Sequence, residues 1–247
     1  MRYFIEFSYN GKNYCGWQSQ PHMLSVQEVL EQALSTLFRV PISLVGAGRT
    51  DAGVHSKQMF AHFDFDQIID DNFIKKINSF LPKDIAVYHF HKVKDNAHAR
   101  FDAIQRTYEY YINYEKDPFL YEFSYYQYQK LDILLMNNAC QILKQYSDFQ
   151  CFSKTKTDVK TYICEIKNAF WIERANQLIF TITADRFLRN MVRAIVGTML
   201  NIGTKKINLT DFKAIIESKN RGQAGFSVPA NALFLTEVKY PSEIFIN

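Results

Sequence analysis

Residues 46–56 read GAGRTDAGVHS, a stretch with three of the chain's nine glycines in eight positions, around one arginine and one carboxylate. Residues 57–65 then alternate apolar and polar side chains at the two-residue period of a strand, and residues 42–47 before it are also typical of a strand. The stretch therefore predicts a tight connection between two strands. Its glycines can adopt positive φ and let the backbone pass close to a flat or bulky ligand, with Arg49 and Asp51 between them.

Two other glycine-rich motifs do not fit this loop. A phosphate-binding loop requires Lys and then Ser or Thr after its second glycine, whereas Val54 and His55 follow Gly53. A dinucleotide-binding fingerprint opens a helix, whereas the residues after Gly53 run at strand period. A plain Asp-x-Gly turn without a functional role remains the alternative to a site.

Composition narrows the class of protein. The chain has 247 residues, 47% of them hydrophobic and 22% charged, which is typical of a soluble globular protein of one large or two small domains. We expect a cytoplasmic protein without membrane association, because neither a signal-peptide pattern nor a membrane-length apolar window is visible. The four cysteines form no C-x-x-C pair, so reduced thiols and no metal site are expected. The net charge of +4 is compatible with a polyanionic partner without requiring one.

Hydrophobic periodicity predicts an α+β fold with a mainly antiparallel sheet. Strands are expected at residues 2–9, 42–47, 57–65, 85–93, 106–114, 161–173, 177–184 and 233–240, and helices after residue 25 and at 72–80, 131–144, 188–202 and 210–218. Ser25 and Glu28 have the spacing of a capping box. Hairpins mixed among helices, without a regular βαβ run, favour the α+β class. We expect two halves of similar content, residues 1–104 with the Asp51 loop and residues 105–247.

A second candidate group lies on the helix expected at residues 188–202. Arg189 and Arg193 are four residues apart, on the shoulder of its apolar face. A guanidinium in that position is partly desolvated and needs an anion. The alternative is that both side chains extend to water, as basic residues at the margin of a helix usually do.

Residues 48–55, GRTDAGVH, resemble the signature of the tRNA pseudouridine synthase A family. Further matches follow in family order: YCGWQ at 14–18, SVQE at 25–28, HARF at 98–101, RTYEY at 106–110, NMVR at 190–193, IVG at 195–197 and a closing strand at 233–240. The resemblance covers essentially the whole chain. Two segments depart from the family pattern: residues 184–189 are more basic, and residues 226–232 only loosely resemble Thr-Ala-Pro-Ala-x-Gly.

The resemblance implies the pseudouridine synthase fold, a mainly antiparallel mixed sheet with helices on one side and two similar halves flanking a central RNA-binding cleft. It implies an isomerase that converts uridine to pseudouridine in the anticodon arm of tRNA, at conventional nucleotide positions 38 to 40. The C1′–N1 bond breaks, the uracil rotates while held, and C5 joins the ribose, so no metal and no small-molecule cofactor are expected. The family also suggests a homodimer.

The resemblance also implies roles for individual residues. Asp51 is the expected nucleophile, attacking the base or the ribose, or acting as a base at the sugar. Arg193 is the candidate cation that keeps this carboxylate charged. Arg49 is suited to filling the space of the extruded nucleotide or holding its phosphate. Tyr108 is expected to stack on the uracil and assist proton removal from C5, with sheet packing as the alternative, and Arg189 to face RNA phosphate.

Two other functions are alternatives to this enzyme. A zinc-dependent nucleoside deaminase would need His-x-Glu and Pro-Cys-x-x-Cys, and the sequence contains neither motif. An RNA-binding module of the same fold, helping tRNA to fold without turnover, remains as the second hypothesis. The complete set of Arg49, Asp51, Tyr108 and Arg193 favours the enzyme.

Overall fold

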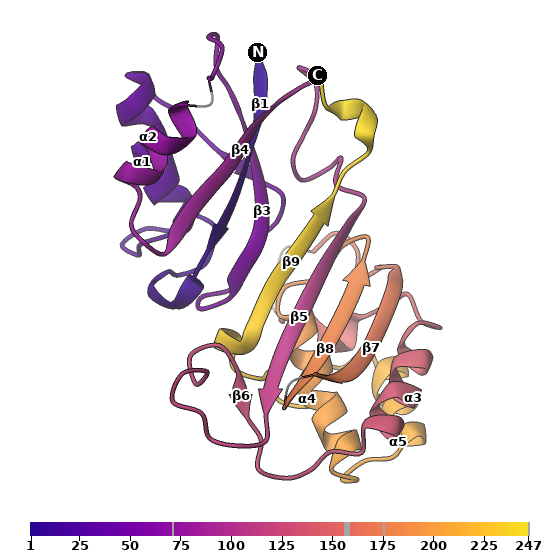
Figure 1. The fold of residues 1–247 in the computed structure, drawn as a ribbon. Helices are drawn as coiled ribbons and strands as arrows, with labels where there is room; N and C mark the ends of the chain where they lie inside the picture. Colours follow the sequence, from indigo (N-terminus) through magenta and orange to yellow (C-terminus); the bar gives the residue numbers. More distant parts are fainter. Residues whose placement is uncertain (71, 156–158, 175, 247) are drawn as a thin grey trace. The chain divides into compact units, whose positions relative to one another are not determined.

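The computed structural model describes residues 1–70, 72–155, 159–174 and 176–246 (Figure 1). Its strands and α-helices are β1 (Arg2–Tyr9), α1 (Val26–Phe38), β2 (Val45–Gly46), β3 (His55–Asp64), α2 (Asn72–Phe80), β4 (Ile85–Val93), β5 (Gln105–Asn113), β6 (Tyr125–Tyr126), α3 (Ile133–Leu143), β7 (Ile166–Arg174), β8 (Gln177–Ala184), α4 (Met191–Gly203), α5 (Leu209–Glu217) and β9 (Leu233–Lys239). The chain divides into two compact units, which consist of residues 1–105 with 235–247 and of residues 106–234.

The last residues of the chain belong to the first unit, not to the second as expected. The second unit starts at Arg106, close to the expected boundary, but residues 235–247 return to the N-terminal unit. The reason lies in the partners of this segment: β9 neighbours β3, Ile104 N donates to Lys239 O (2.8 Å), and the Tyr240 hydroxyl donates to Ala99 O (2.6 Å). Periodicity predicts that residues 233–240 form a strand, but it does not identify the partner of that strand.

In the first unit, β1 pairs antiparallel with β3 on one edge and with β4 on the other, and β2 pairs with β3. Helices α1 and α2 lie next to each other, and α2 packs on β4 (Figure 1). Phe38, the last residue of α1, stacks on Phe65 and Phe73 with ring centroids 4.0 and 4.5 Å apart. Aromatic stacking of this kind adds specific contacts to the burial of apolar surface, and here it joins the helices to the sheet.

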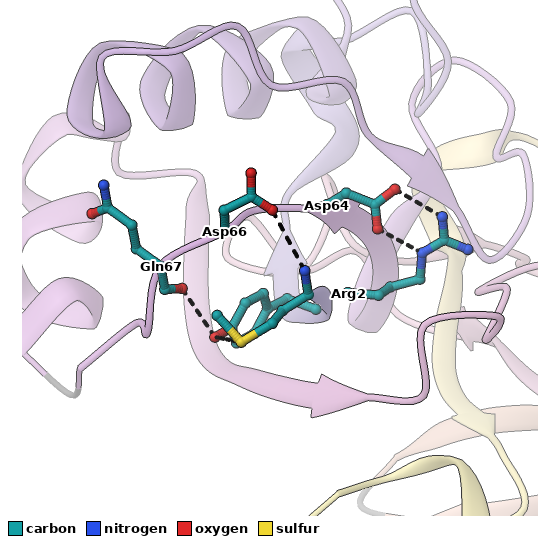
Figure 2. A network of polar contacts seen from close by, with 6 residues as sticks. Arg2, Asp64, Asp66 and Gln67 are labelled. Carbon is teal, nitrogen blue, oxygen red and sulfur yellow. Dashed lines mark hydrogen bonds and ion pairs between the residues drawn. The ribbon is translucent and has the colours of Figure 1, made fainter.

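Polar contacts fix the start of β1 to the end of β3 and the chain beyond it (Figure 2). The Arg2 guanidinium forms two hydrogen bonds to the Asp64 carboxylate, at 2.9 and 2.8 Å, and this pairing lowers the pKa of Asp64. The N-terminal amine lies 3.7 Å from Asp66 Oδ1, and the Tyr3 hydroxyl donates to the backbone oxygen of Gln67 (3.1 Å). The first residues of the chain are therefore part of the folded unit.

In the second unit, β8 pairs antiparallel with both β5 and β7, and the short β6 pairs parallel with β5. Helix α3 packs on β7 and contacts α4 and α5. Trp171 on β7 stacks on Phe180 (4.7 Å), and its indole N–H donates to the sulfur of Met199 on α4 (3.2 Å). Almost every residue of α4 is buried, so this helix forms the centre of the unit.

The α+β class with mainly antiparallel pairing is confirmed, and several element bounds match their predictions. The predicted bounds are exact for β1, α2, β4 and β8. The predicted strand at residues 42–47 is wrong in length, because only Val45–Gly46 pairs with β3. The amides of Ile42 and Leu44 donate instead to Ser35 Oγ (2.9 Å) and Glu31 Oε1 (2.7 Å) on α1.

Two later elements begin after their predicted starts. Strand β7 begins at Ile166 because residues 162–164 bond to the segment before it: Phe149 N donates to Tyr162 O (3.1 Å) and Cys164 N donates to Ser147 O (2.9 Å). Helix α4 begins at Met191, not at residue 188.

All four cysteines are free thiols in the structure. Burial raises the pKa of Cys140, Cys151 and Cys164 to about 12, so these three thiols stay protonated. Within the described ranges, no helix is both long and apolar enough to span a bilayer.

Candidate active site

Residues 47–54 form the predicted tight connection between β2 and β3. Ala47 N donates to Phe60 O (2.8 Å) where the loop begins, and Val54 N donates to Asp51 O (3.1 Å) where it ends. Gly53 has φ +79°, a conformation that glycine adopts at little cost. Asp51 is half-buried at the start of this final turn, and Arg49 is exposed.

Thr50 fixes the backbone that carries Asp51. Its hydroxyl lies 2.9 Å from the Tyr9 hydroxyl at the end of β1, and it accepts a hydrogen bond from Trp17 N (3.0 Å). Gly16 has φ +108°, and a Cβ at this position would overlap the Thr50 carbonyl oxygen. The segment before α1 therefore packs directly on the Thr50–Asp51 peptide.

Glycines around the loop serve two different purposes. A Cβ at Gly11 would overlap Val54 O, and a Cβ at Gly46 would overlap the Trp17 indole, so both positions need the small residue for close packing. At Gly48, by contrast, no described atom lies within 4 Å of an added Cβ. His55 is buried and accepts from Gly11 N (3.0 Å), which is a structural role.

Arg193 lies on the first turn of α4 in the second unit and is half-buried. Its Nε donates to Val228 O (2.7 Å), and Val228 N donates to Arg193 O (3.3 Å). Burial raises the pKa of Tyr110 on β5 well above its usual value, and the positive charge of Arg193 opposes this shift. The Arg193 side chain is thus fixed near β5, and it does not simply extend to water.

Tyr108 lies on β5, opposite Ile182 of β8, and is half-buried. Its ring makes an edge-to-face contact with Phe187 (5.1 Å). Tyr110, on the same strand face, is fully buried and donates its hydroxyl to Pro229 O (3.1 Å). Packing accounts for Tyr110, whereas the ring of Tyr108 stays partly accessible at the margin of this buried face.

Arg189 is not on a helix, so the prediction that it shares a helical face with Arg193 is wrong. Asn190 precedes α4 with φ +67°, and a left-handed residue cannot continue a right-handed helix backwards. Arg189 is exposed, and its backbone oxygen accepts from Lys154 N (3.0 Å).

The structure brings Arg49 and Asp51 together on one loop of the first unit, and it positions Tyr108 and Arg193 on neighbouring elements of the second. The expected pairing of Asp51 with Arg193 joins residues of the two units and stays a prediction. In the ranges given above, no group of three or more His, Cys, Asp or Glu side chains could hold a metal ion.

Comparison with known proteins identifies the family. The family model for tRNA pseudouridine synthase matches residues 6–102 and 139–241. A protein of Parabacteroides distasonis named tRNA pseudouridine synthase A is 53% identical over 246 residues, which cover 99% of this chain and 98% of that protein. The chain belongs to the tRNA pseudouridine synthase family. Proteins of the same name from Clostridium acetobutylicum and Francisella tularensis subsp. holarctica are 39% and 35% identical over 96% and 98% of this chain and 98% and 95% of theirs.

The resemblance of residues 48–55 to this family is therefore confirmed. Arg49, Asp51, Arg189 and Arg193 fall within the residues matched by the family model. Tyr108 falls between the two matched segments, in residues 103–138, although the full-length relatives cover this stretch as well.

Sequence reasoning missed the residues that hold the site. Tyr9 had no assigned role, and Gly16 appeared only as part of a motif. The one available signal was a glycine between a predicted strand and a predicted helix, which indicates a special backbone position but not its contact with Thr50. The contact between Val228 and Arg193 gave no signal, because it uses a main-chain oxygen.

Proposed function

We propose that this protein isomerises uridine to pseudouridine in the anticodon stem-loop of tRNA, at conventional nucleotide positions 38–40. Membership of the tRNA pseudouridine synthase family and the names of its relatives support the substrate and the reaction. The observation that carries the proposal for this chain is the half-buried Asp51 on a loop whose backbone is fixed by Thr50. An ionisable group held in this way is pre-positioned to react with a nucleotide brought to it.

Asp51 is the nucleophile in this proposal, attacking the base or the ribose, or else acting as a base at the sugar. The C1′–N1 bond breaks, the uracil turns, and a C1′–C5 bond forms; the proton lost from C5 is balanced by the one gained at N1. Substrate and product have the same composition, so the reaction is an isomerisation with no net oxidation.

The arginines and Tyr108 support this chemistry. Arg193 supplies the positive charge that keeps Asp51 ionised. Tyr108 stacks on the uracil, and its hydroxyl assists removal of the C5 proton. Arg49 fills the space of the extruded nucleotide or holds its phosphate, since a base inside a helical stem is reached only by flipping, at a cost of ~a few kcal/mol. Arg189, exposed ahead of α4, binds RNA phosphate.

The proposal extends to the working form of the protein, which is a homodimer in the cytoplasm. Measurement of the molar mass in solution, for example by light scattering, tests the dimer. A mass of one chain, 29.0 kDa, at working concentration would contradict it.

The proposal is tested by incubating pure protein with unmodified tRNA transcripts and mapping pseudouridine with a base-specific chemical readout. We expect product at nucleotides 38–40, and loss of the signal at each position where cytidine replaces uridine. Binding of the transcript without any product would contradict the enzyme and favour the tRNA-folding helper. Product elsewhere in the tRNA, with none in the anticodon arm, would contradict the assigned substrate position.

A further inference from the structure

Residues 225–229, called the strap below, lie directly on helix α4 of the second unit. Gly225 N donates to the hydroxyl of the fully buried Thr198 (2.8 Å). A Cβ at Gly225 would lie 2.7 Å from the backbone carbon of Gly197, and a Cβ at Gly197 would overlap the backbone oxygen of Phe226. The two backbones are thus in contact where the strap crosses the helix.

Arg221 holds the strap through two groups of its guanidinium. Nη1 donates to Gly225 O (3.0 Å) and Nη2 donates to Ser227 Oγ (2.8 Å). The same Ser227 oxygen accepts from Asn190 Nδ2 (2.6 Å). Asn190 is the N-cap residue of α4, yet its side chain does not cap the helix amides. Arg221 therefore ties two points of the strap together and, through Ser227, to the start of α4.

Residues at the far end of the strap bond to α4, which carries Arg193, and to β5, which carries Tyr108. Val228 O accepts from Arg193 Nε (2.7 Å), and Pro229 O accepts from the Tyr110 hydroxyl (3.1 Å). Because the Nε bond fixes the plane of the guanidinium, a shift of Val228 O moves the direction in which Arg193 presents its Nη groups.

We propose that Arg221 is a positioning residue for pseudouridine formation, because it fixes the strap on α4 and thereby orients the Arg193 guanidinium. The inference rests on the proposed function, in which Arg193 keeps Asp51 charged. Arg221 acts through the strap and does not contact the reacting uridine.

The departure of residues 226–232 from the family pattern leaves these contacts to α4 and β5 in place. Arg193 and Tyr110 bond to the main-chain oxygens of Val228 and Pro229, which any residue supplies at those positions. Two side chains are needed to hold the strap: the guanidinium of Arg221, which bonds to two points of it, and a hydrogen-bond acceptor at position 227.

The test compares Arg221→Met, Arg221→Lys, Ser227→Ala and Arg193→Met with wild type. Lys219→Met is the matched control, because Lys219 is a nearby cation that pairs with Asp148 (2.7 Å) and not with the strap. Single-turnover rates at saturating tRNA are measured from pH 6 to 9, with tRNA affinity and thermal unfolding measured in parallel. The last two measurements separate weak binding and poor folding from a change in the chemical step.

We expect Arg221→Met to lose rate at saturation by about 10- to 100-fold, since a misplacement of about 1 Å can cost 10²-fold. The loss is largest at low pH, as for Arg193→Met, while tRNA affinity changes less than about twofold. Ser227→Ala should lose less rate, and Lys219→Met should match wild type. Arg221→Lys should recover part of the rate, because its single ammonium nitrogen can replace only one of the two guanidinium nitrogens that bond to the strap.

Three outcomes would overturn the inference. Suppose that Arg221→Met is folded and keeps the wild-type rate and pH profile, while Arg193→Met has lost activity. This result would contradict the positioning role of Arg221 but not the proposed function. A loss confined to tRNA affinity would show that Arg221 binds RNA. Wild-type activity of Arg193→Met would contradict the role of Arg193 in the proposed function, and the positioning role with it. If Arg221→Met does not fold, the rates and pH profiles of Ser227→Ala and Arg221→Lys are compared with those of wild type and Arg193→Met. Wild-type behaviour of both variants would then contradict the positioning role.

Discussion

Thr50 fixes the backbone that carries Asp51, and Val228 fixes the side chain of Arg193. In both cases the group expected to react, or to bind the reacting group, is held by its structural neighbours before RNA arrives. Positioning of this kind reduces the entropy lost on reaching the transition state. At the scale of single residues, the backbone that carries Asp51 and the side chain of Arg193 are therefore each held in place by their own neighbours.

Replacing Arg193 tests the expected link between the two units. If Arg193 pairs with Asp51 as proposed, Arg193→Met removes the positive charge that favours the ionised carboxylate, so the rate should fall mostly at low pH, by about 10- to 100-fold at pH 6. Arg193→Lys should recover only part of the rate, because it keeps the charge but loses the bond to Val228 and the planar fork.

Single-turnover rate against pH on saturating tRNA is the measurement for both variants. Arg189→Met is the control from the same segment, and it should weaken tRNA binding and reduce its salt dependence with little effect on the saturated rate. A wild-type pH profile for Arg193→Met would contradict this role and would point to another cation, such as Arg49 on the same loop, as the group that keeps Asp51 charged.

The bounds of a helix or strand were predictable where the hydrophobic period extended over the whole element. They were not predictable where a feature outside that period set the first or last residue. Strands β1, β4 and β8 and helix α2 show their hydrophobic period over the whole length, and their bounds were exact. The start of α4 was wrong because a left-handed Asn190 has no signature in the hydrophobic period. Ser25 Oγ accepts from Glu28 N (3.2 Å), which is one of the two bonds of the predicted capping box. The complete capping box of α5, formed by Asn208 and Asp211, was not predicted.

The glycines around the Asp51 loop give a prediction at the scale of this element. Gly16→Ala should lower the free energy of unfolding by about 2–4 kcal/mol and disturb Asp51, because its φ is +108° and the added Cβ overlaps Thr50 O. Gly48→Ala should leave the free energy of unfolding within about 0.5 kcal/mol of wild type, because the added Cβ meets no described atom.

Urea-induced unfolding and single-turnover rates distinguish the two variants. If RNA passes close to this part of the loop, Gly48→Ala should lose activity or tRNA affinity although it is as stable as wild type. Gly48→Ala with full activity would contradict close approach of RNA at this glycine. Gly16→Ala with wild-type stability would contradict the contact between residue 16 and Thr50.

At the scale of the whole molecule, the α+β class and the candidate residues followed from the sequence. The assignment of the C-terminal segment to one of the two units did not. The composition of residues 46–56 indicated a candidate site, because three glycines around Arg49 and Asp51 are unusual in a chain with nine. The return of residues 235–247 to the first unit, and the contacts of the strap with α4, join segments far apart in sequence. Local periodicity carries no information on such pairings.

The stability of the first unit should depend on pH through His62. This side chain is buried and its Nδ1 accepts from Ala99 N (3.1 Å); burial, followed by the nearby charge of Arg2, lowers the pKa of His62 to about 4. The unfolded chain, in which the pKa is about 6.5, therefore binds the proton first as the pH falls. Between pH 7 and pH 5 this linkage should remove about 2 kcal/mol from the free energy of unfolding.

His62→Asn retains an acceptor for Ala99 N but does not titrate. The free energy of unfolding of this variant, relative to that of wild type, should therefore rise by about 2 kcal/mol between pH 7 and pH 5. A Trp171→Phe background leaves Trp17 as the single tryptophan and as a fluorescent reporter of the first unit in urea unfolding. Parallel curves of stability against pH for the two proteins would show that His62 does not titrate in this way.

We propose that Asp51 carries the chemistry, and the single-turnover rate of pseudouridine formation by Asp51→Asn on saturating tRNA tests this role. Asn has nearly the same size and the same turn-forming capacity but no charge, so the rate should fall on the order of 10⁴-fold or more while tRNA binding persists. Asp66→Asn, at a fully exposed carboxylate of the same unit, should match wild type. An Asp51→Asn preparation free of host enzyme that forms pseudouridine at a rate near wild type would contradict the account.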